Sequence, residues 1–121
     1  MNQIETLEDI QKLIESKSEE SLTLEYKGVL DKKNKEIAKD ISAFANTSGG
    51  VVIYGIEEKR HVPRSIRWID AENTKERIEN IILSNIQPQI RDVIINPITN
   101  PENSSQAIFV VNIPESPDAP H

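Results

Sequence analysis

Three side chains near the start of the chain have types and a spacing that could do chemistry: Glu20, Glu25 and Lys27, in the pattern E-x4-E-x-K. Carboxylate oxygens are ligands that Mg²⁺ and Mn²⁺ accept readily, and such a cation neutralises charge that develops on a phosphate. An ammonium two residues along one strand face lies within roughly 7 Å of the second carboxylate. The pattern is therefore compatible with a catalytic set for phosphodiester cleavage. The alternative is an exposed Glu/Lys pair, which adds little to stability.

A further acid for such a site follows the apolar run Val51–Ile56, where Glu57 and Glu58 stand next in the chain. If this run is a strand parallel to the strand of Lys27, then Lys27 and Glu57 lie at one edge of the sheet. Ligands of open α/β sheets bind at the carboxyl ends of strands. The expected metal set is therefore Glu20 and Glu25 with Glu57 or Glu58, and its cofactor would be Mg²⁺ or Mn²⁺. The alternative is that the last two are acids of an exposed turn.

The remaining motifs point to structure more than to chemistry. The segment Asn46-Thr47-Ser48-Gly49-Gly50 follows a helix, and the dipole at a helix C-terminus disfavours anions. Asn46, Thr47, Gly49, Gly50 and the later Gly55 are therefore expected to be structural turn residues. No G-x-x-x-x-G-K-[ST] motif is present, so this segment is not expected to hydrolyse ATP. His61 and His121 are predicted to be surface residues.

Hydrophobic periodicity predicts the elements that position these residues. A short acidic helix begins after Thr6, and two longer helices are expected, the second of them capped by Asp70. The segment between the central strand and Arg64 is predicted to be an exposed turn. The result is an α/β (α+β) mixed sheet of four to five strands with two main helices packed on it. The expected ranges are strands 22–27, 51–56, 92–98 and 106–113, helices 35–46 and 71–85, and the turn 57–63.

Composition limits the possible classes. The chain has 121 residues, no cysteine and a net charge of −6. One domain is expected, with the proline-rich residues 114–121 as its end or a linker. Without cysteine there is no thiol chemistry, which fits a cytoplasmic protein. The apolar runs are too short for a membrane span.

Charge is unevenly distributed along the chain. Residues 27–67 carry nine bases and five acids, a surplus of four positive charges around the motif. This surplus predicts a basic patch, and a solvated surface of mixed charge is the alternative. The cations expected to meet phosphates are Lys27, Lys32, Lys33, Lys35, Lys59 and Arg60.

Taken together, E-x4-E-Y-K at residues 20–27 and A-F-A-N-T-S-G-G at residues 43–50, followed by an apolar strand ending in Gly55-Ile56, resemble the Schlafen AlbA domain. The ending Ser116-Pro117-Asp118-Ala119-Pro120-His121 is similar as well. The family usually has an aspartate-rich turn where this chain has Glu57-Glu58. It also has a later Tyr-x-Arg-x-Gly element, which this chain lacks.

The resemblance implies an Alba-like fold and a DNA-binding domain of a bacterial transcriptional regulator or helicase-like protein, as the N-terminal part of a longer chain. Its alternative, from vertebrate Schlafens, is a metal-dependent RNase in which Lys27 accompanies Glu20, Glu25 and the turn acid. A second alternative is a structural or dimerisation lobe without a ligand. The implied partners are DNA or RNA and a second copy of the chain, with no membrane.

Overall fold

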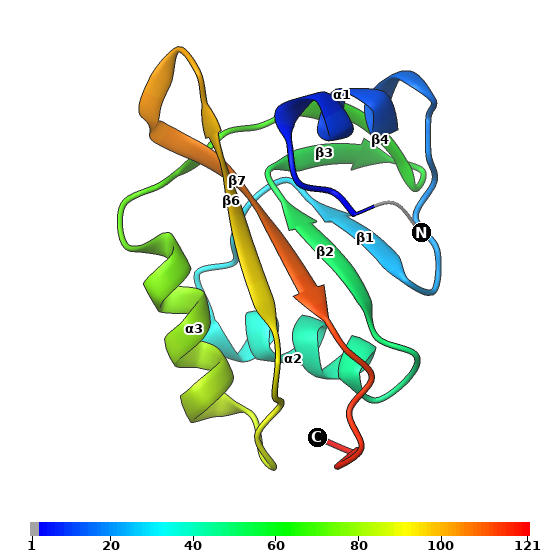
Figure 1. Ribbon diagram of the computed structural model, residues 1–121, viewed down its shortest axis with the longest axis vertical. Coiled ribbons are helices and arrows are strands. Elements are labelled where there is room, and N and C mark those ends of the chain that lie inside the picture. Colours follow the sequence, from blue (N-terminus) through cyan, green and yellow to red (C-terminus); the bar gives the residue numbers. More distant parts are fainter. Residues whose placement is uncertain (1–2) are drawn as a thin grey trace.

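The computed structural model describes residues 3–121, which form three helices and seven strands (Figure 1). No helix among these residues is long and apolar enough to cross a membrane. The helices are α1 (Leu7–Glu15), α2 (Asn34–Ala45) and α3 (Thr74–Asn85). The strands are β1 (Leu24–Lys27), β2 (Gly50–Tyr54), β3 (Ile56–Lys59), β4 (Val62–Ile66), β5 (Ile69–Asp70), β6 (Ile94–Asn100) and β7 (Asn103–Ile113).

Five strands form one mixed sheet. β1 pairs in parallel with β2, and β2 pairs antiparallel with the last part of β7. β5 pairs with an earlier part of β7, and β6 pairs antiparallel with β7 over most of its length. β3 and β4 form a separate antiparallel hairpin. The expected α+β class and the antiparallel final pair are confirmed.

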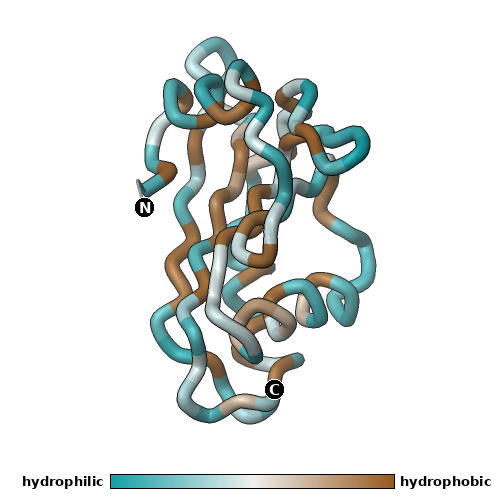
Figure 2. Tube along the Cα trace, turned by 90° about the vertical axis from the view of Figure 1, so that its right-hand side faces the viewer, coloured by the Kyte–Doolittle hydropathy of each residue, from teal (hydrophilic) through white to brown (hydrophobic). Residues whose placement is uncertain are grey.

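The centre of the sheet is buried on both faces. Val52 and Tyr54 of β2 lie in a core beneath α2 and α3, whereas Ile53 lies in a second core with Ile10 of α1 and Ile56 of β3. Successive strand residues point to opposite faces, so each core takes alternate residues of β2. Figure 2 shows hydrophobic residues along the strands inside the molecule and mostly hydrophilic residues on the peripheral loops. Double burial explains the continuous apolar run of β2.

Two helices begin close to where local chemistry places them. Thr6 and Asp9 form a reciprocal capping box at α1, in which the Thr6 hydroxyl accepts from the Asp9 amide at 3.2 Å and the Asp9 carboxylate accepts from the Thr6 amide at 3.0 Å. α2 begins one residue before the predicted start and buries Ile37, Ile41 and Phe44 at helical spacing. Tertiary contacts therefore add to a pattern that is already helical.

The start of α3 differs from the prediction. Asp70 was expected to cap a helix beginning at Ala71, but it lies in β5 opposite Gln106 of β7. The chain then turns through Asn73, whose φ of 61° is left-handed, and the helix begins at Thr74. Pairing with β7, which the local pattern does not reveal, takes residue 70 away from the helix. Ile78 and Ile81 of α3 are buried, at the helical spacing that predicts the element.

The strand expected from Leu22 begins instead at Leu24. The amide of Ser21 donates to the carbonyl of Leu24 at 2.9 Å, so residues 21–24 form a tight turn. Leu22 lies at the tip of this turn and is 92% exposed. Alternation of apolar residues extends past the true start of the strand, so the predicted range 22–27 included two residues of this turn.

The predicted exposed turn at 57–63 is a β-hairpin. Only Arg60 and His61 connect β3 with β4, and both have positive φ, 54° and 70°. Consecutive left-handed residues form the tight hairpin turn whose twist matches the strands. Glycine or asparagine usually marks such a turn, and the outer residues of β3 are charged. The sequence therefore carried neither the usual turn signal nor strand alternation.

The turn from α2 to β2 requires glycine at two successive positions. Gly49 has φ of 78°, and a Cβ built on it would lie 2.6 Å from the carbonyl oxygen of Ile113. A Cβ on Gly50 would lie 2.5 Å from the ring of Phe44 and 2.8 Å from the carbonyl oxygen of Thr23. Gly49 accepts the left-handed conformation, and Gly50 lets β2 pass directly under α2. Gly55 also has positive φ, 115°, between β2 and β3.

Residues 114–121 pack against the end of α2. The Ser116 amide donates to the Ala45 carbonyl at 3.0 Å, and the His121 amide donates to Oδ1 of Asn46 at 2.7 Å. The His121 ring contacts the Ser116 hydroxyl at 2.6 Å. The proline-rich segment thus leaves the sheet, as its prolines require, and crosses the helix terminus.

Replacing Gly49 by alanine is expected to lower the free energy of unfolding by about 1–3 kcal/mol, because a left-handed non-glycine residue is strained and its Cβ meets backbone atoms. Urea unfolding followed by circular dichroism measures this. Gly28→Ala is the matched control, since the atom nearest to its Cβ would belong to the flexible side chain of Glu57, at 3.3 Å, and the backbone of Glu57 would lie at an ordinary contact distance of 3.8 Å. Equal unfolding midpoints for the two variants would contradict the assigned role of Gly49.

Candidate metal and nucleic-acid site beside strand β1

The free edge of β1 is covered by the residues that precede it. β1 pairs with β2 on one side only, so the amides on its other side need acceptors. Oε2 of Glu20 accepts from the Tyr26 amide at 2.9 Å. The Tyr26 ring is buried in the second core, and its hydroxyl donates to the Ser18 carbonyl at 2.7 Å. Glu20 is therefore held at a fixed place along the edge of β1.

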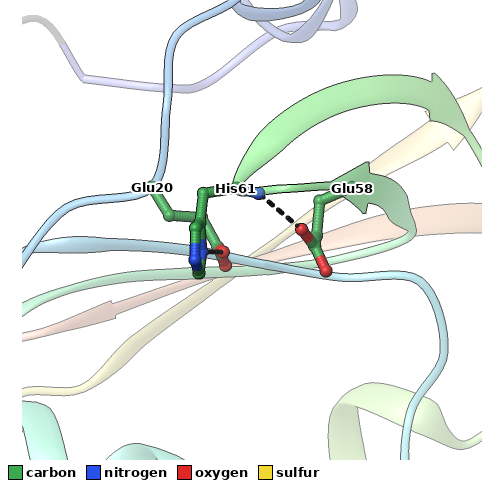
Figure 3. A group of neighbouring side chains, drawn as sticks. All are labelled: Glu20, Glu58 and His61. Atoms are coloured by element: carbon green, nitrogen blue, oxygen red, sulfur yellow. Dashed lines mark hydrogen bonds and ion pairs between the residues drawn. The ribbon is translucent and has the colours of Figure 1, made fainter.

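The β3–β4 hairpin approaches the same carboxylate. The Glu20 amide donates to the His61 carbonyl at 2.8 Å, and Oε1 of Glu20 lies 2.8 Å from Nδ1 of His61. The His61 amide in turn donates to Oε2 of Glu58 at 2.9 Å (Figure 3). One possible ligand atom from each of these three side chains lies within 4.8 Å of the other two. This is a set of two carboxylates and one imidazole.

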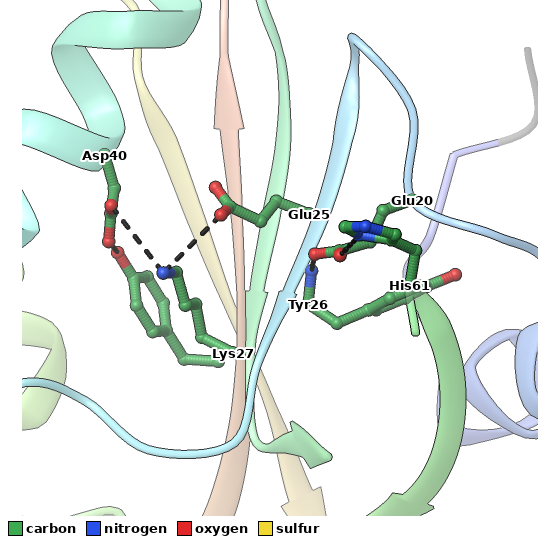
Figure 4. A network of polar contacts seen from close by, with 7 residues as sticks. Glu20, Glu25, Tyr26, Lys27, Asp40 and His61 are labelled. Carbon is green, nitrogen blue, oxygen red and sulfur yellow. Dashed lines mark hydrogen bonds and ion pairs between the residues drawn. The ribbon is translucent and has the colours of Figure 1, made fainter. Parts of the chain in front are cut away.

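Glu25 and Lys27 lie on the other face of β1, toward α2. Lys27 Nζ is 3.5 Å from Oε1 of Glu25 and 3.9 Å from Oδ1 of Asp40 (Figure 4). Oδ2 of Asp40 accepts from the Tyr54 hydroxyl at 3.4 Å. Figure 4 shows the Glu25 carboxylate directed toward Lys27 and the Glu20 carboxylate beside His61. The two motif acids therefore belong to neighbouring clusters.

Of the four acids in the predicted metal set, two converge and two are paired with other side chains. Glu20 and Glu58 meet, whereas Glu57 Oε1 accepts from Arg67 at 2.7 Å and Glu25 is paired with Lys27. All four still line one surface depression of about 580 Å³, together with Lys27 and His61. Glu25 is turned away because it projects from a face of β1, while Glu20 approaches the edge of that strand.

Pairing and burial change the acidities in both clusters. The hydrogen bond to Glu20, reinforced by its charge, raises the pKa of His61. Burial raises the pKa of Asp40, although the ammonium of Lys27 opposes this. Burial acts to lower the pKa of Lys27, but the charges of Asp40 and Glu25 outweigh it and the pKa is raised. Lys27 is therefore an ammonium at neutral pH, suited to stabilising negative charge and not to accepting a proton.

Two tyrosines also have raised pKa values. Burial, with a smaller effect from Glu20, raises the pKa of Tyr26 to about 12. Burial and the Asp40 carboxylate raise the pKa of Tyr54. Both hydroxyls therefore remain protonated hydrogen-bond donors at neutral pH. They fix the surrounding acceptors and are unsuited to act as nucleophiles.

The expected phosphate-binding cations do not form one continuous patch. Lys32 and Lys33 lie in the loop after β1, whereas Lys59 and Arg60 are at the tip of the β3–β4 hairpin (Figure 1). Within residues 3–121 none of these four forms a salt bridge with a carboxylate. None of the four lines the acid-lined depression, although Lys59 and Arg60 stand between Glu58 and His61, which do, and Lys35 lines a different groove on α2.

Sequence reasoning missed three residues that the structure brings into these clusters. His61 was predicted to be an ordinary surface residue; its side chain is 76% exposed but is bonded to Glu20. The spacing Glu58-x-x-His61 across a short turn was the available signal. Asp40 was an acid within the apolar pattern of α2, and Tyr54 ended an apolar strand. A carboxylate and a hydroxyl at these two positions of otherwise apolar segments were the available signal of a partner for Lys27.

Fold and site together define an α+β domain with an acid-lined depression and basic residues in the adjoining hairpin tip and loop. The chain belongs to the Schlafen, AlbA_2 family, whose model matches residues 20–121. The expected resemblance is therefore confirmed, and the family is consistent with a nucleic-acid-related domain. The match begins at Glu20 and includes all the predicted site residues. No curated protein matches the chain significantly.

The pairing of His61 with Glu20 gives a pH prediction. A raised folded-state pKa means that the pair stabilises the fold fully below the unfolded-state pKa of about 6.5, and that this contribution is lost as pH rises through the higher folded-state value. NMR titration of the His61 ring is expected to give a pKa above 6.5, which falls in Glu20→Gln. Glu15→Gln is the control for loss of a distant charge. An unchanged His61 pKa in Glu20→Gln would contradict the assignment.

Proposed function

We propose that this domain binds nucleic acid. A phosphate would lie at the acid-lined depression beside β1, and a divalent cation would bridge this phosphate and the carboxylates of the depression. The observation that carries the proposal is a set of cations on segments that adjoin that depression: Lys59 and Arg60 stand between Glu58 and His61 at the hairpin tip, and Lys32 and Lys33 are in the loop that follows Lys27 and Gly28. Within residues 3–121 none of these cations forms a salt bridge. Nucleic acids are bound chiefly through phosphate contacts with such side chains. Family membership supports the same conclusion.

The cation would be held by Glu20, Glu58 and His61, whose ligand atoms converge. Two hard oxygens and an imidazole suit Mn²⁺ better than Mg²⁺, because nitrogen ligands favour transition metals. The bond from the Tyr26 amide to Glu20 would orient that ligand, as hydrogen bonds to metal-binding carboxylates do. When bound, the ion would neutralise the carboxylates and contact a phosphate oxygen.

A cation matters here because the depression by itself repels phosphate. Glu20, Glu25, Glu57 and Glu58 outnumber Lys27 and the titratable His61 at its surface. Glu25 and Glu57 already have cationic partners, whereas Glu20 and Glu58 are bonded to the His61 imidazole and to the amides of Tyr26 and His61. Their charges remain to be balanced when a phosphate approaches. A divalent ion at this point supplies the missing positive charge.

Family resemblance further suggests the setting: a DNA-binding domain in a bacterial transcriptional regulator, acting as a homodimer. The two copies would not join through the edges of their sheets, because β6 carries Pro97 and the edge of β1 is covered by Glu20 and Ser21. A second copy would therefore associate through side-chain surfaces, placing two basic groups along one nucleic acid.

Binding is measured with fluorescently labelled DNA and RNA oligonucleotides at low salt, in EDTA and in MnCl₂. We expect Mn²⁺ to tighten binding at least several-fold. We expect Lys59→Ala with Arg60→Ala to weaken binding, and each lost phosphate contact to reduce the slope of log affinity against log salt by about 0.7–0.9. Lys12→Ala on α1 is the control for a lost surface charge. Sedimentation of the same samples is expected to give two chains per oligonucleotide.

A structural lobe without a ligand makes the opposite prediction. Neither Mn²⁺ nor oligonucleotide would then shift the melting temperature, although a ligand that binds only the folded state raises it. No binding of any oligonucleotide by the wild-type chain at low salt, with or without Mn²⁺, would refute the proposed function.

Metal-dependent RNA cleavage is the second candidate, and Lys27 is the observation that favours it. Its ammonium lines the same depression as the three converging side chains and is held by Glu25 and Asp40. In phosphodiester hydrolysis, water forms one P–O bond as another breaks, and the departing oxygen takes up a proton. Lys27 would stabilise the added negative charge, and, with His61 held as a metal ligand, water would supply that proton.

Cleavage of a structured RNA in MnCl₂ is the test. Lys27→Met and Glu20→Gln are each expected to slow cleavage at least about 100-fold, as removal of groups that stabilise a transition state does. Glu15→Gln on α1 should cleave at the wild-type rate. Cleavage that persists in Glu20→Gln would reject the assignment, whereas metal-dependent binding without cleavage would favour the binding function.

A further inference from the structure

A second groove, remote from the acids of β1, runs along α2. It has a volume of about 590 Å³ and is lined by Lys35, Lys39 and Ser42 of α2 and by Asn85 and Gln87 at the end of α3. Its described lining includes no aspartate or glutamate side chain, and neither lysine forms a salt bridge within the described part of the chain. In a chain of net charge −6, a groove with two cations and no acidic side chain attracts an anion.

The polar groups of this groove suit a phosphodiester chain. Residues three and four apart share a helix face, so Lys35, Lys39 and Ser42 form one row along α2. Asn85 and Gln87 face that row with carboxamides, which donate to phosphate and can also bond the edges of bases. Two ammonium groups one helical turn apart fit a repeating anion better than a single carboxylate.

This groove continues into the site described above. Ala43 lines both the α2 groove and a neighbouring depression of about 590 Å³, which contains Leu22, Leu24 and Phe44. That second depression shares Glu20, Glu25 and His61 with the acid-lined depression beside β1. The three hollows therefore form one path, which is basic on α2, apolar at Leu22 and acidic at Glu20.

The apolar middle of the path distinguishes between forms of nucleic acid. Leu22 is 92% exposed, and with Leu24 it offers aliphatic surface where a base face could pack. Bases expose their faces only when they are unpaired. A single strand can place one base over Leu22 while its backbone phosphates meet the lysines of α2 on one side and the acid-lined depression on the other.

We infer that the domain binds single-stranded nucleic acid along this path, with backbone phosphates at Lys35 and Lys39, a base over Leu22 and the next phosphates at the acid-lined depression. The inference deepens the proposed function and rests on it. It moves Lys35 from the expected patch at β1 to a separate phosphate-binding row, and it adds Lys39 and Leu22 to the interface.

Fluorescence anisotropy with a 15-nucleotide single strand and the duplex of the same sequence tests the inference, across a range of salt in MnCl₂. Lys35→Ala with Lys39→Ala is expected to reduce the slope of log affinity against log salt by about 1.4, the value for two single-strand phosphate contacts. Leu22→Ser should weaken single-strand binding several-fold without changing this slope. Lys75→Ala on α3 lines none of the three hollows and should match the wild type.

The outcomes separate the two proposals. Wild-type binding with an unchanged slope in the double lysine variant, or tighter binding of the duplex than of the single strand, overturns the inference and leaves nucleic-acid binding itself intact. Absence of all binding by the wild-type chain overturns the proposed function and the inference together. Circular dichroism melting of each variant confirms that the substitutions, all at exposed positions, leave the fold in place.

Discussion

Burial of β2 between two hydrophobic cores is the constraint on which the other elements depend. Its alternate residues enter opposite cores, so α2 and α3 must cover one face while α1 and the β3–β4 hairpin cover the other. Each fully buried Ile or Val contributes roughly 1.5–3 kcal/mol, and β2 supplies such residues to both sides. Gly49 and Gly50 are needed because β2 passes against Phe44 and beside residues 113–115 on leaving α2. The acid-lined depression forms where β1, pinned to β2, meets the hairpin from the second layer.

The same arrangement explains how carboxylates collect at one place at tolerable cost. Each has a specific partner: Glu20 has the Tyr26 amide and His61, Glu25 has Lys27, and Glu57 has Arg67. Hydrogen bonds and opposite charges offset the mutual repulsion of the acids, and partial exposure leaves water to screen what remains. Lys27 connects β1 with α2, because its ammonium pairs with Asp40, which also accepts from the Tyr54 hydroxyl of β2. This pairing keeps Lys27 charged. The depression is thus supported by elements from both cores.

Binding and cleavage require different things of this site. Binding needs only an attraction for phosphate. The cations on α2, in the loop after β1 and at the hairpin tip supply it once the central acids are neutralised. Cleavage needs a metal at a fixed distance from the reacting phosphate and a stabilised transition state. Three converging side chains and a fixed ammonium meet part of that need, which is why one depression supports both proposals. In this chain Glu57 is bound to Arg67, and the side chains that converge are Glu20, Glu58 and His61.

Sequence by itself determined the elements whose side chains repeat with a clear period: α2, the apolar strand β2, the inward face of α3 and the final hairpin. It also determined the family, through residues 20–27 and 43–56. Tertiary structure alone decided which acids meet. Glu20 and Glu25 stand five residues apart in the chain, yet one lies at the edge of β1 and the other on its face, because a turn at Ser21 precedes the strand. His61 joined the site only because the hairpin folds back over that edge, a long-range contact that leaves no periodic trace in the sequence. Local patterns record which face is buried, whereas the meeting of side chains from different elements depends on packing that no single segment contains.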